Sequence, residues 1–171
     1  YNLIAQLDEA DRARGVVCAS AGNHGQGVAF ACSRLGIQGR IFVPTTTPRQ
    51  KRDRMIAIGG PFVDLVVTGD SYDDAAAAAK QAAAESGSVL VPAFDDPATI
   101  AGQGTIGPEI VAGLGKAPDL LVVPVGGGGL LAGLVAWFGE RYPATRIVGV
   151  EPAGAACLVA ALDSGQPVTL A

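Results

Sequence analysis

Short runs of hydrophobic, mostly β-branched residues alternate along the sequence with longer, alanine-rich segments of helical periodicity. This alternation is typical of strand–helix–strand units, in which a mainly parallel sheet is covered by helices on both faces. We therefore predict the α/β fold class. The expected strands are Val16–Ala19, Arg40–Val43, Phe62–Val67, Val89–Val91, Leu120–Val123 and Arg146–Val150.

The helical segments between these strands are bounded by residues that favour helix ends. Gly36, Gly59 and Gly115 follow the last periodic residue of a helix, and Asp70-Ser71 precedes an acid-rich first turn. The expected helices are Asn23–Leu35, Pro48–Ile58, Tyr72–Glu85, Pro97–Leu114, Leu130–Tyr142 and Ala155–Leu162.

The alternating pattern breaks at residues 93–97, between two parts of similar size. We interpret this break as a crossover between two lobes, a small one over residues 15–92 and part of a larger one over residues 93–171. Residues 1–14 are expected to contribute a helix, because Leu3, Ile4 and Leu7 share one face at helical spacing. Both ends of the sequence are expected to lie within a larger molecule.

Composition and charge exclude several classes of partner. The net charge of −4 disfavours nucleic acid, whose binding proteins generally carry a basic patch. The apolar runs fall far short of the roughly 20 residues of a membrane span. Three cysteines and a single histidine show no metal-ligand spacing, so we predict no metal site and reduced thiols in the cytoplasm.

The segment Gly126–Leu130 is a candidate phosphate-binding loop. Four consecutive glycines, Gly126, Gly127, Gly128 and Gly129, stand between an expected strand and an expected helix. Without Cβ atoms, their N–H groups can converge on an anion at the positive end of the helix. The spacing differs from the dinucleotide and triphosphate motifs, and no Lys or Arg is near, which favours a single monoester phosphate. The alternative is a flexible turn without a ligand.

A second small-residue turn, Ser20-Ala21-Gly22-Asn23-His24, also joins a strand to a helix. It offers N–H donors to a carboxylate, and the Asn23 amide could reach a ring hydroxyl. Alternatively, Ser20 or Asn23 only caps the helix and His24 is a structural residue. Because ligands collect at the carboxyl ends of strands in α/β sheets, the two turns indicate a phosphate and a small polar molecule. They do not name a reaction.

Two strings in this order, Ser20-Ala21-Gly22-Asn23-His24-Gly25-Gln26-Gly27 and Val123-Pro124-Val125-Gly126-Gly127-Gly128-Gly129-Leu130, resemble the threonine dehydratase and serine racemase group of pyridoxal-phosphate enzymes. The resemblance spans essentially the whole chain. Further matching stretches are Phe94-Asp95-Asp96-Pro97, Ile100-Ala101-Gly102-Gln103-Gly104-Thr105 and Val148-Gly149-Val150-Glu151-Pro152.

The resemblance implies the tryptophan-synthase-like fold (fold type II) with pyridoxal 5'-phosphate between the two lobes. It assigns Asn23 to the cofactor's ring hydroxyl and the N–H groups of Gly126–Leu130 to its phosphate. The carboxylate of the amino-acid substrate would be bound by Ser20, Ala21, Gly22 and His24. The resemblance also implies a homo-oligomer for the full-length protein.

The activity that the resemblance implies is deamination of L-threonine to 2-oxobutanoate and ammonia, as in isoleucine biosynthesis, and of serine to pyruvate. The catalytic Schiff-base lysine of the group precedes a pair that resembles Tyr1-Asn2. None of Lys51, Lys80 and Lys116 stands in such a context. We therefore expect the lysine to lie upstream of Tyr1 and the 171 residues alone to have no turnover.

Two other functions stay open. A serine racemase or serine dehydratase of the same group is disfavoured because the Glu151-Pro152 pair leads to Cys157, whereas a Mg²⁺ site needs oxygen ligands. In this interpretation Glu151 is a structural acid. The other alternative is a non-catalytic module that binds a phosphate ligand or an amino acid. A cysteine-synthase-like activity is less expected, since Asn23 is followed by His24 instead of threonine.

Overall fold

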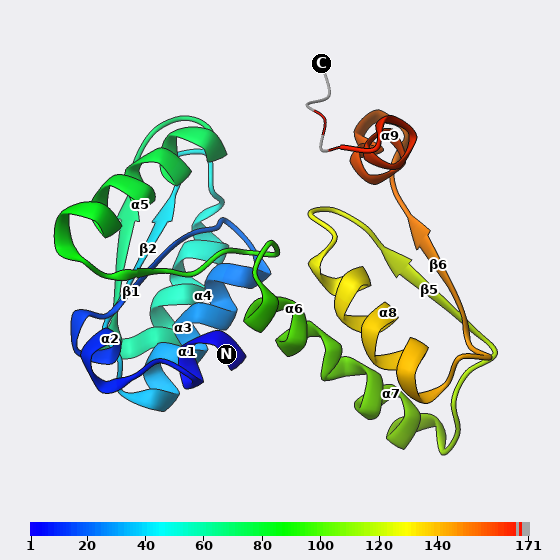
Figure 1. Ribbon diagram of the computed structural model, residues 1–171. Helices are drawn as coiled ribbons and strands as arrows, with labels where there is room; N and C mark the ends of the chain where they lie inside the picture. The colour runs from blue at the N-terminus through cyan, green and yellow to red at the C-terminus, as the bar shows by residue number, and fades with distance from the viewer. Residues whose placement is uncertain (167, 169–171) are drawn as a thin grey trace. The chain divides into compact units, whose positions relative to one another are not determined.

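The computed structural model describes residues 1–166 and 168. The end of the expected 93–171 lobe, residues 167 and 169–171, lies outside the described residues. The chain forms two compact units, Tyr1–Ala93 and Phe94–Ala171. Each unit combines parallel strands with helices (Figure 1), which confirms the predicted α/β class.

The first unit is built on a four-stranded parallel sheet, all of it within residues that the structure describes. The order β3-β2-β1-β4 places β1 between β2 and β4. The strands are β1 (Val16–Ala19), β2 (Gly39–Val43), β3 (Val63–Val67) and β4 (Val89–Leu90). The helical elements are α1 (Asn2–Ala5), α2 (Glu9–Arg14), α3 (Asn23–Leu35), α4 (Arg49–Gly59), the 3-10 turn η1 (Gly60–Phe62) and α5 (Tyr72–Ser86).

Helices cover both faces of this sheet because its central strands are apolar on both faces. Val16 and Cys18 pack with residues of α1, α3 and α4, whereas Val17 packs with the alanines of α5. Figure 1 shows α5 on the opposite face of the sheet from α3 and α4. This alternation follows from the two-residue period of a strand. The small side chains of Ala75 and Ala79 are fully buried, so α5 lies close to the sheet.

The second unit, in its described residues, pairs β5 (Leu120–Pro124) with β6 (Arg146–Val150) in parallel, and α8 (Gly129–Arg141) connects them. Val123, Leu134 and Phe138 form the buried core between strand and helix. The remaining helical elements are α6 (Pro97–Gly104), α7 (Ile106–Leu114), the 3-10 turn η2 (Ala153–Ala155) and α9 (Cys157–Ser164).

Helices α6 and α8 pack backbone to backbone. A Cβ on Gly133 would lie 2.6 Å from the Gly104 nitrogen, and a Cβ on Gly104 would lie 3.0 Å from the Gly133 oxygen. Real Cβ contacts are not as short as the one at Gly133, so this position needs glycine, whereas a Cβ on Gly104 would be tight and would require a small backbone shift. The close packing fixes the axis of α8, whose first residue, Gly129, is the last of the four consecutive glycines.

Two expected helices differ from the structure. The expected helix Pro97–Leu114 is divided at Thr105 into α6 and α7. The reason is Pro108, which lacks the N–H that would bond the Gly104 carbonyl and whose ring would clash with that carbonyl. Residues 1–14 form two short helices instead of one, because the Asp8 side chain accepts from the Asp11 N–H at 2.7 Å and begins α2 there.

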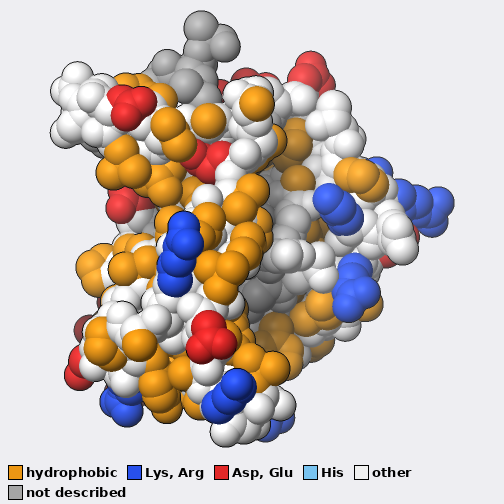
Figure 2. All heavy atoms as spheres, turned by 90° about the vertical axis from the view of Figure 1, so that its right-hand side faces the viewer, with side chains coloured by type: hydrophobic (Ala, Val, Ile, Leu, Met, Phe, Trp, Pro, Cys, Tyr) orange, Lys and Arg blue, Asp and Glu red, His pale blue; other side chains and the backbone are white. Residues whose placement is uncertain are grey.

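The sheet of the second unit carries apolar side chains on an open face. Leu120, Val122 and Val150 are each about half exposed. Figure 2 shows hydrophobic side chains gathered over β5 and β6. Such strands, apolar on both faces, are typical of parallel sheets. Among the described helices, none combines the length and the apolar character needed to cross a membrane.

Candidate functional site

The two sequence-predicted turns each follow the carboxyl end of a parallel strand. Residues 20–24 join β1 to α3 in the first unit, and residues 125–128 join β5 to α8 in the second. Parallel strands present their carboxyl ends, and the N-termini of the following helices, at the same edge of a sheet. Each turn therefore lies, within its own unit, at the edge of a sheet where ligands of α/β proteins commonly bind.

The first loop is held by the side chain of Ser20. The Ser20 N–H donates to the Phe42 carbonyl at 3.0 Å, and the Ser20 hydroxyl accepts from the Gly22 N–H at 3.2 Å. Ser20 is only 9% exposed. Its hydroxyl thus shapes the loop.

Neither Ser20 nor Asn23 caps α3. The N-cap residue is Gly22, and in the part of the chain that the structure describes no side chain accepts from the first turn of this helix. The first N–H groups of α3 therefore have no acceptor within the helix, which leaves them free to bind an anion. Asn23 is the first helical residue and its side chain is exposed.

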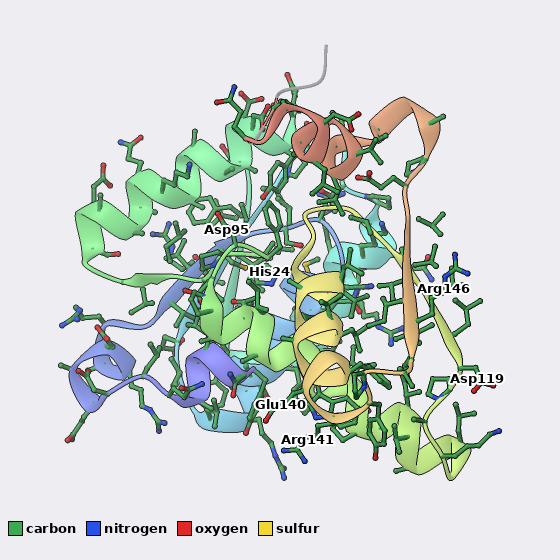
Figure 3. All side chains as sticks on the ribbon, turned by 45° about the vertical axis from the view of Figure 1, so that its right-hand side comes forward. His24, Asp95, Asp119, Glu140, Arg141 and Arg146 are labelled. Atoms are coloured by element: carbon green, nitrogen blue, oxygen red, sulfur yellow. The ribbon has the colours of Figure 1, made fainter. Side chains whose placement is uncertain are left out.

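His24 joins the first loop to the end of β4 (Figure 3). Its Nε2 donates to the Val91 carbonyl at 3.0 Å, because a carbonyl oxygen can only accept. Burial lowers the pKa of His24 below its ordinary value, although the bond to Val91 opposes that shift. The ring is therefore neutral at pH 7, and Nδ1 is left as an acceptor. His24 thus has a structural role, because its ring links the first loop to the main chain after β4.

Met55 packs against Gly25 of α3, the residue that follows the first loop. A Cβ on Gly25 would lie 2.8 Å from the Ser20 carbonyl oxygen and 2.9 Å from Met55 Cε. Met55 belongs to α4 and is fully buried. The sequence gives no signal for this contact, since 30 positions separate the two residues; only the glycine at position 25 suggests a close approach.

The four glycines of the second loop differ in backbone conformation and in the atoms that surround them. Gly128 has φ +83°, a conformation that favours glycine. At Gly127, a Cβ would collide with the Phe94 ring, and at Gly129 it would lie 2.9 Å from Phe94 Cα. At Gly126 a Cβ would meet no described atom within 4 Å. Contacts with Phe94 therefore explain Gly127 and Gly129, and the positive φ explains Gly128. Only Gly126 among the four has neither reason, and its open side faces space that a ligand could fill.

The chemistry of the second loop fits a phosphate group. Val125 N–H donates to Val150 at 2.9 Å, and the Gly128 carbonyl accepts from Ala132 at 2.8 Å. The first-turn N–H groups, including those of Gly129 and Leu130, have no acceptor within α8, and no described side chain caps the helix. An anion at this end is favoured by the helix dipole.

Basic side chains on α8 lie away from the glycine loop. Arg141 ends the 13-residue helix, about 18 Å from its start at 1.5 Å per residue. In Figure 3 Arg141 and Asp119 lie at the end of the second unit opposite Asp95. Arg141 is therefore too far along α8 to contact an anion at the glycine loop, and phosphate binding by main-chain N–H groups stays a prediction.

Glu151 has a structural partner at each carboxylate oxygen. Oε1 accepts from the Leu158 N–H at 2.8 Å and Oε2 from the Val159 N–H at 3.0 Å, so this carboxylate caps α9. Nearby Cys157 begins α9. Among the described residues, no three His, Cys, Asp or Glu side chains are grouped so that they could hold a metal ion.

Comparison with known proteins identifies similar chains. The family model described as "Pyridoxal-phosphate dependent enzyme" matches residues 1–171. The L-threonine dehydratase biosynthetic IlvA of Mycobacterium tuberculosis is 56% identical over 170 residues, which cover 99% of this chain and 40% of the relative. The chain thus spans about 40% of the length of this curated relative.

Solved structures show the same likeness. The processed form of threonine deaminase isoform 2 from Solanum lycopersicum superposes with a TM-score of 0.92 at 44% identity, over 100% of this chain and 49% of that one. Maize serine racemase gives a TM-score of 0.89 at 31% identity, over 99% and 50% of the two chains. Relatives with two different reactions therefore share this fold.

Proposed function

The chain belongs to the family of pyridoxal-phosphate dependent enzymes, and on this premise we propose that its full-length protein deaminates L-threonine to 2-oxobutanoate and ammonia. The observation that carries the proposal is the pair of loops at strand ends, one suited to a phosphate and one to a carboxylate. The identity of 56% to a biosynthetic threonine dehydratase supports the choice of substrate. L-Serine is proposed as a second substrate, with pyruvate as the product.

The glycine loop would hold the cofactor's phosphate. The N–H groups of Gly126–Gly129 and Leu130 would donate to its oxygens, and the open side of Gly126 gives the group room. The exposed amide of Asn23 would bond the ring hydroxyl. When bound, pyridoxal phosphate supplies an electron sink for the charge left at the substrate's Cα after loss of its proton.

The first loop would hold the substrate carboxylate with neutral donors. The uncapped N-terminus of α3 presents N–H groups there, and the Ser20 hydroxyl fixes Gly22 in the loop. Neutral His24 uses its one N–H on the Val91 carbonyl, so it would shape the loop beside the carboxylate and would not donate to it. Ala21 adds no bulk to the loop. We propose that the lysine which would hold the cofactor and accept the proton from the substrate's Cα lies outside the 171 residues.

Serine racemase activity is the alternative that the maize relative suggests. Two features favour deamination instead: the higher identity to threonine dehydratases and the use of both Glu151 oxygens to cap α9. For the assembly and location of the full-length protein, we propose a homo-oligomer in the cytoplasm.

The test is an assay of the full-length protein with pyridoxal phosphate and either L-threonine or L-serine. We expect release of 2-oxobutanoate and ammonia from threonine, with a slower reaction from serine, and loss of most activity in the Asn23→Ala variant. Formation of D-serine without a keto acid would favour the racemase. A protein that binds the cofactor but converts neither amino acid would support a non-catalytic module.

A further inference from the structure

We propose that Phe94 is a positioning residue, which orders the glycine loop so that its N–H groups are set for a phosphate before the phosphate arrives. This inference rests on the proposed function and deepens it. Phe94 begins the second unit, and its ring lies against the glycine loop of that same unit.

The contacts of Phe94 occupy one side of the loop. Its ring fills the space where a Cβ of Gly127 would stand; that Cβ would lie 2.6 Å from Phe94 Cε1. Its backbone fills the corresponding space at Gly129, where a Cβ would lie 3.0 Å from the Phe94 oxygen. No described atom lies within 4 Å of the Cβ positions of Gly126 and Gly128. The loop is thus packed against Phe94 at alternate residues and open at the others.

Phe94 lies three residues before the start of α6, which is a capped helix. Two residues further on, Asp96 Oδ1 accepts from the Ala98 N–H at 2.8 Å and from the Thr99 N–H at 3.0 Å, which caps this helix. Helix α6 is in turn locked to α8 where Gly104 meets Gly133. The first part of α8 is therefore contacted on both sides of α6, by Gly104 at the end of that helix and by Phe94 just before its start.

Burial alone does not explain a phenylalanine at this position. Phe94 remains 44% exposed, which is a poor use of a large apolar side chain for core packing. Its contacts are directed at glycines, whose backbone is the least restricted of any residue. Confining that backbone in advance removes part of the ordering that phosphate binding would otherwise require, so affinity for the phosphate rises.

The experiment measures affinity for pyridoxal phosphate and for pyridoxal, which lacks the phosphate, in the full-length protein. The variants are Phe94→Ala, the conservative Phe94→Tyr, and Phe30→Ala as a control with an exposed ring in the first unit. We expect Phe94→Ala to weaken binding of pyridoxal phosphate by about tenfold, to leave pyridoxal affinity unchanged and to speed amide exchange at Gly126–Gly129 in the cofactor-free protein. Phe94→Tyr and Phe30→Ala should match the wild type.

The possible outcomes separate the inference from the function on which it rests. A wild type that binds neither compound overturns the proposed function. A wild type that binds pyridoxal phosphate, with a Phe94→Ala variant that binds it equally tightly, overturns only the inference. Equal losses of affinity for both compounds also overturn it, because they show a general structural role. If Phe94→Ala does not fold, Phe94→Leu replaces it, with the same expected direction and the same contradicting results.

Discussion

The imidazole of His24 donates from Nε2 to the main-chain carbonyl of Val91 at 3.0 Å, across 67 positions of sequence. This bond ties the first loop to the residue that follows β4. Only Pro92 and Ala93 separate Val91 from Phe94, whose ring lies on the glycine loop of the second unit. The short segment 91–94 therefore contacts the first loop through Val91 and the glycine loop through Phe94, each within its own unit.

Lowering the pH should destabilise the first unit through His24. Burial lowers its folded-state pKa below the ordinary 6.5, so the unfolded chain takes up the proton first as pH falls. The contribution of neutral His24 to the free energy of unfolding is therefore complete above pH 6.5. It declines below that pH, with a slope of at most about 1.4 kcal/mol per pH unit. Unfolding by urea between pH 7.5 and about 5 checks this, with His24→Asn as control. Equal slopes for the two proteins would refute it.

Replacement of Gly133 by alanine should destabilise the second unit by about 1–3 kcal/mol, because its Cβ would press on the backbone of α6. Gly139 provides a matched control in the same helix. It is exposed, and a Cβ there would meet no described atom within 4 Å, so Gly139→Ala should stabilise the protein by up to about 1 kcal/mol. Denaturant unfolding measures both; similar effects would contradict the packing of α6 on α8.

The Asp96→Ala variant should lose about 1 kcal/mol of stability, because Asp96 accepts from two N–H groups at the start of α6. Neighbouring Asp95 is exposed and does not cap the helix. We expect Asp95→Ala to change the free energy of unfolding by less than about 0.5 kcal/mol. Thermal and urea unfolding of both variants test the difference, and a larger effect at Asp95 would reverse the assignment.

The thiols should differ sharply in reactivity. Burial raises the pKa of Cys18 to about 12 and that of Cys32 to about 11. At pH 8 the Cys32 thiolate is on the order of one in a thousand, and both side chains are buried, so neither should react with a disulfide reagent in the folded protein. Cys157 is exposed and should react first. Rapid reaction of Cys18 or Cys32 without denaturant would contradict this packing.

Local patterns predicted most of the secondary structure. The short apolar run Val16–Ala19 and the small-residue turn after it predicted β1 and α3 with the bounds that the structure shows. Pro108 divides α6 from α7, and the prediction of one helix over Pro97–Leu114 did not take this proline into account. Proline is tolerated in the first turn of a helix, where Pro108 stands in α7. The helical periodicity therefore continues on both sides of the break and does not reveal it.

The sequence identified the candidate loops but not the contacts that shape them. Glycine-rich turns after strands predicted where a phosphate and a carboxylate could bind. The partners of those glycines, Met55 under Gly25 and Phe94 on Gly127, lie about 30 positions away along the chain. Contacts at such separations depend on tertiary packing, so a single sequence does not specify them. Only the structure shows that a Cβ would collide with Phe94 at Gly127 and would have open space at Gly126.

The central claim is that the bare main chain of Gly126–Gly129 binds a phosphate whose attached ring contacts Asn23. A crystal structure of the full-length protein with pyridoxal phosphate tests it most directly. We predict phosphate oxygens within about 3 Å of several nitrogens of the loop, and the Asn23 amide within hydrogen-bond distance of the ring hydroxyl. A bound cofactor whose phosphate lies away from this loop, or whose ring is out of reach of Asn23, would contradict the account.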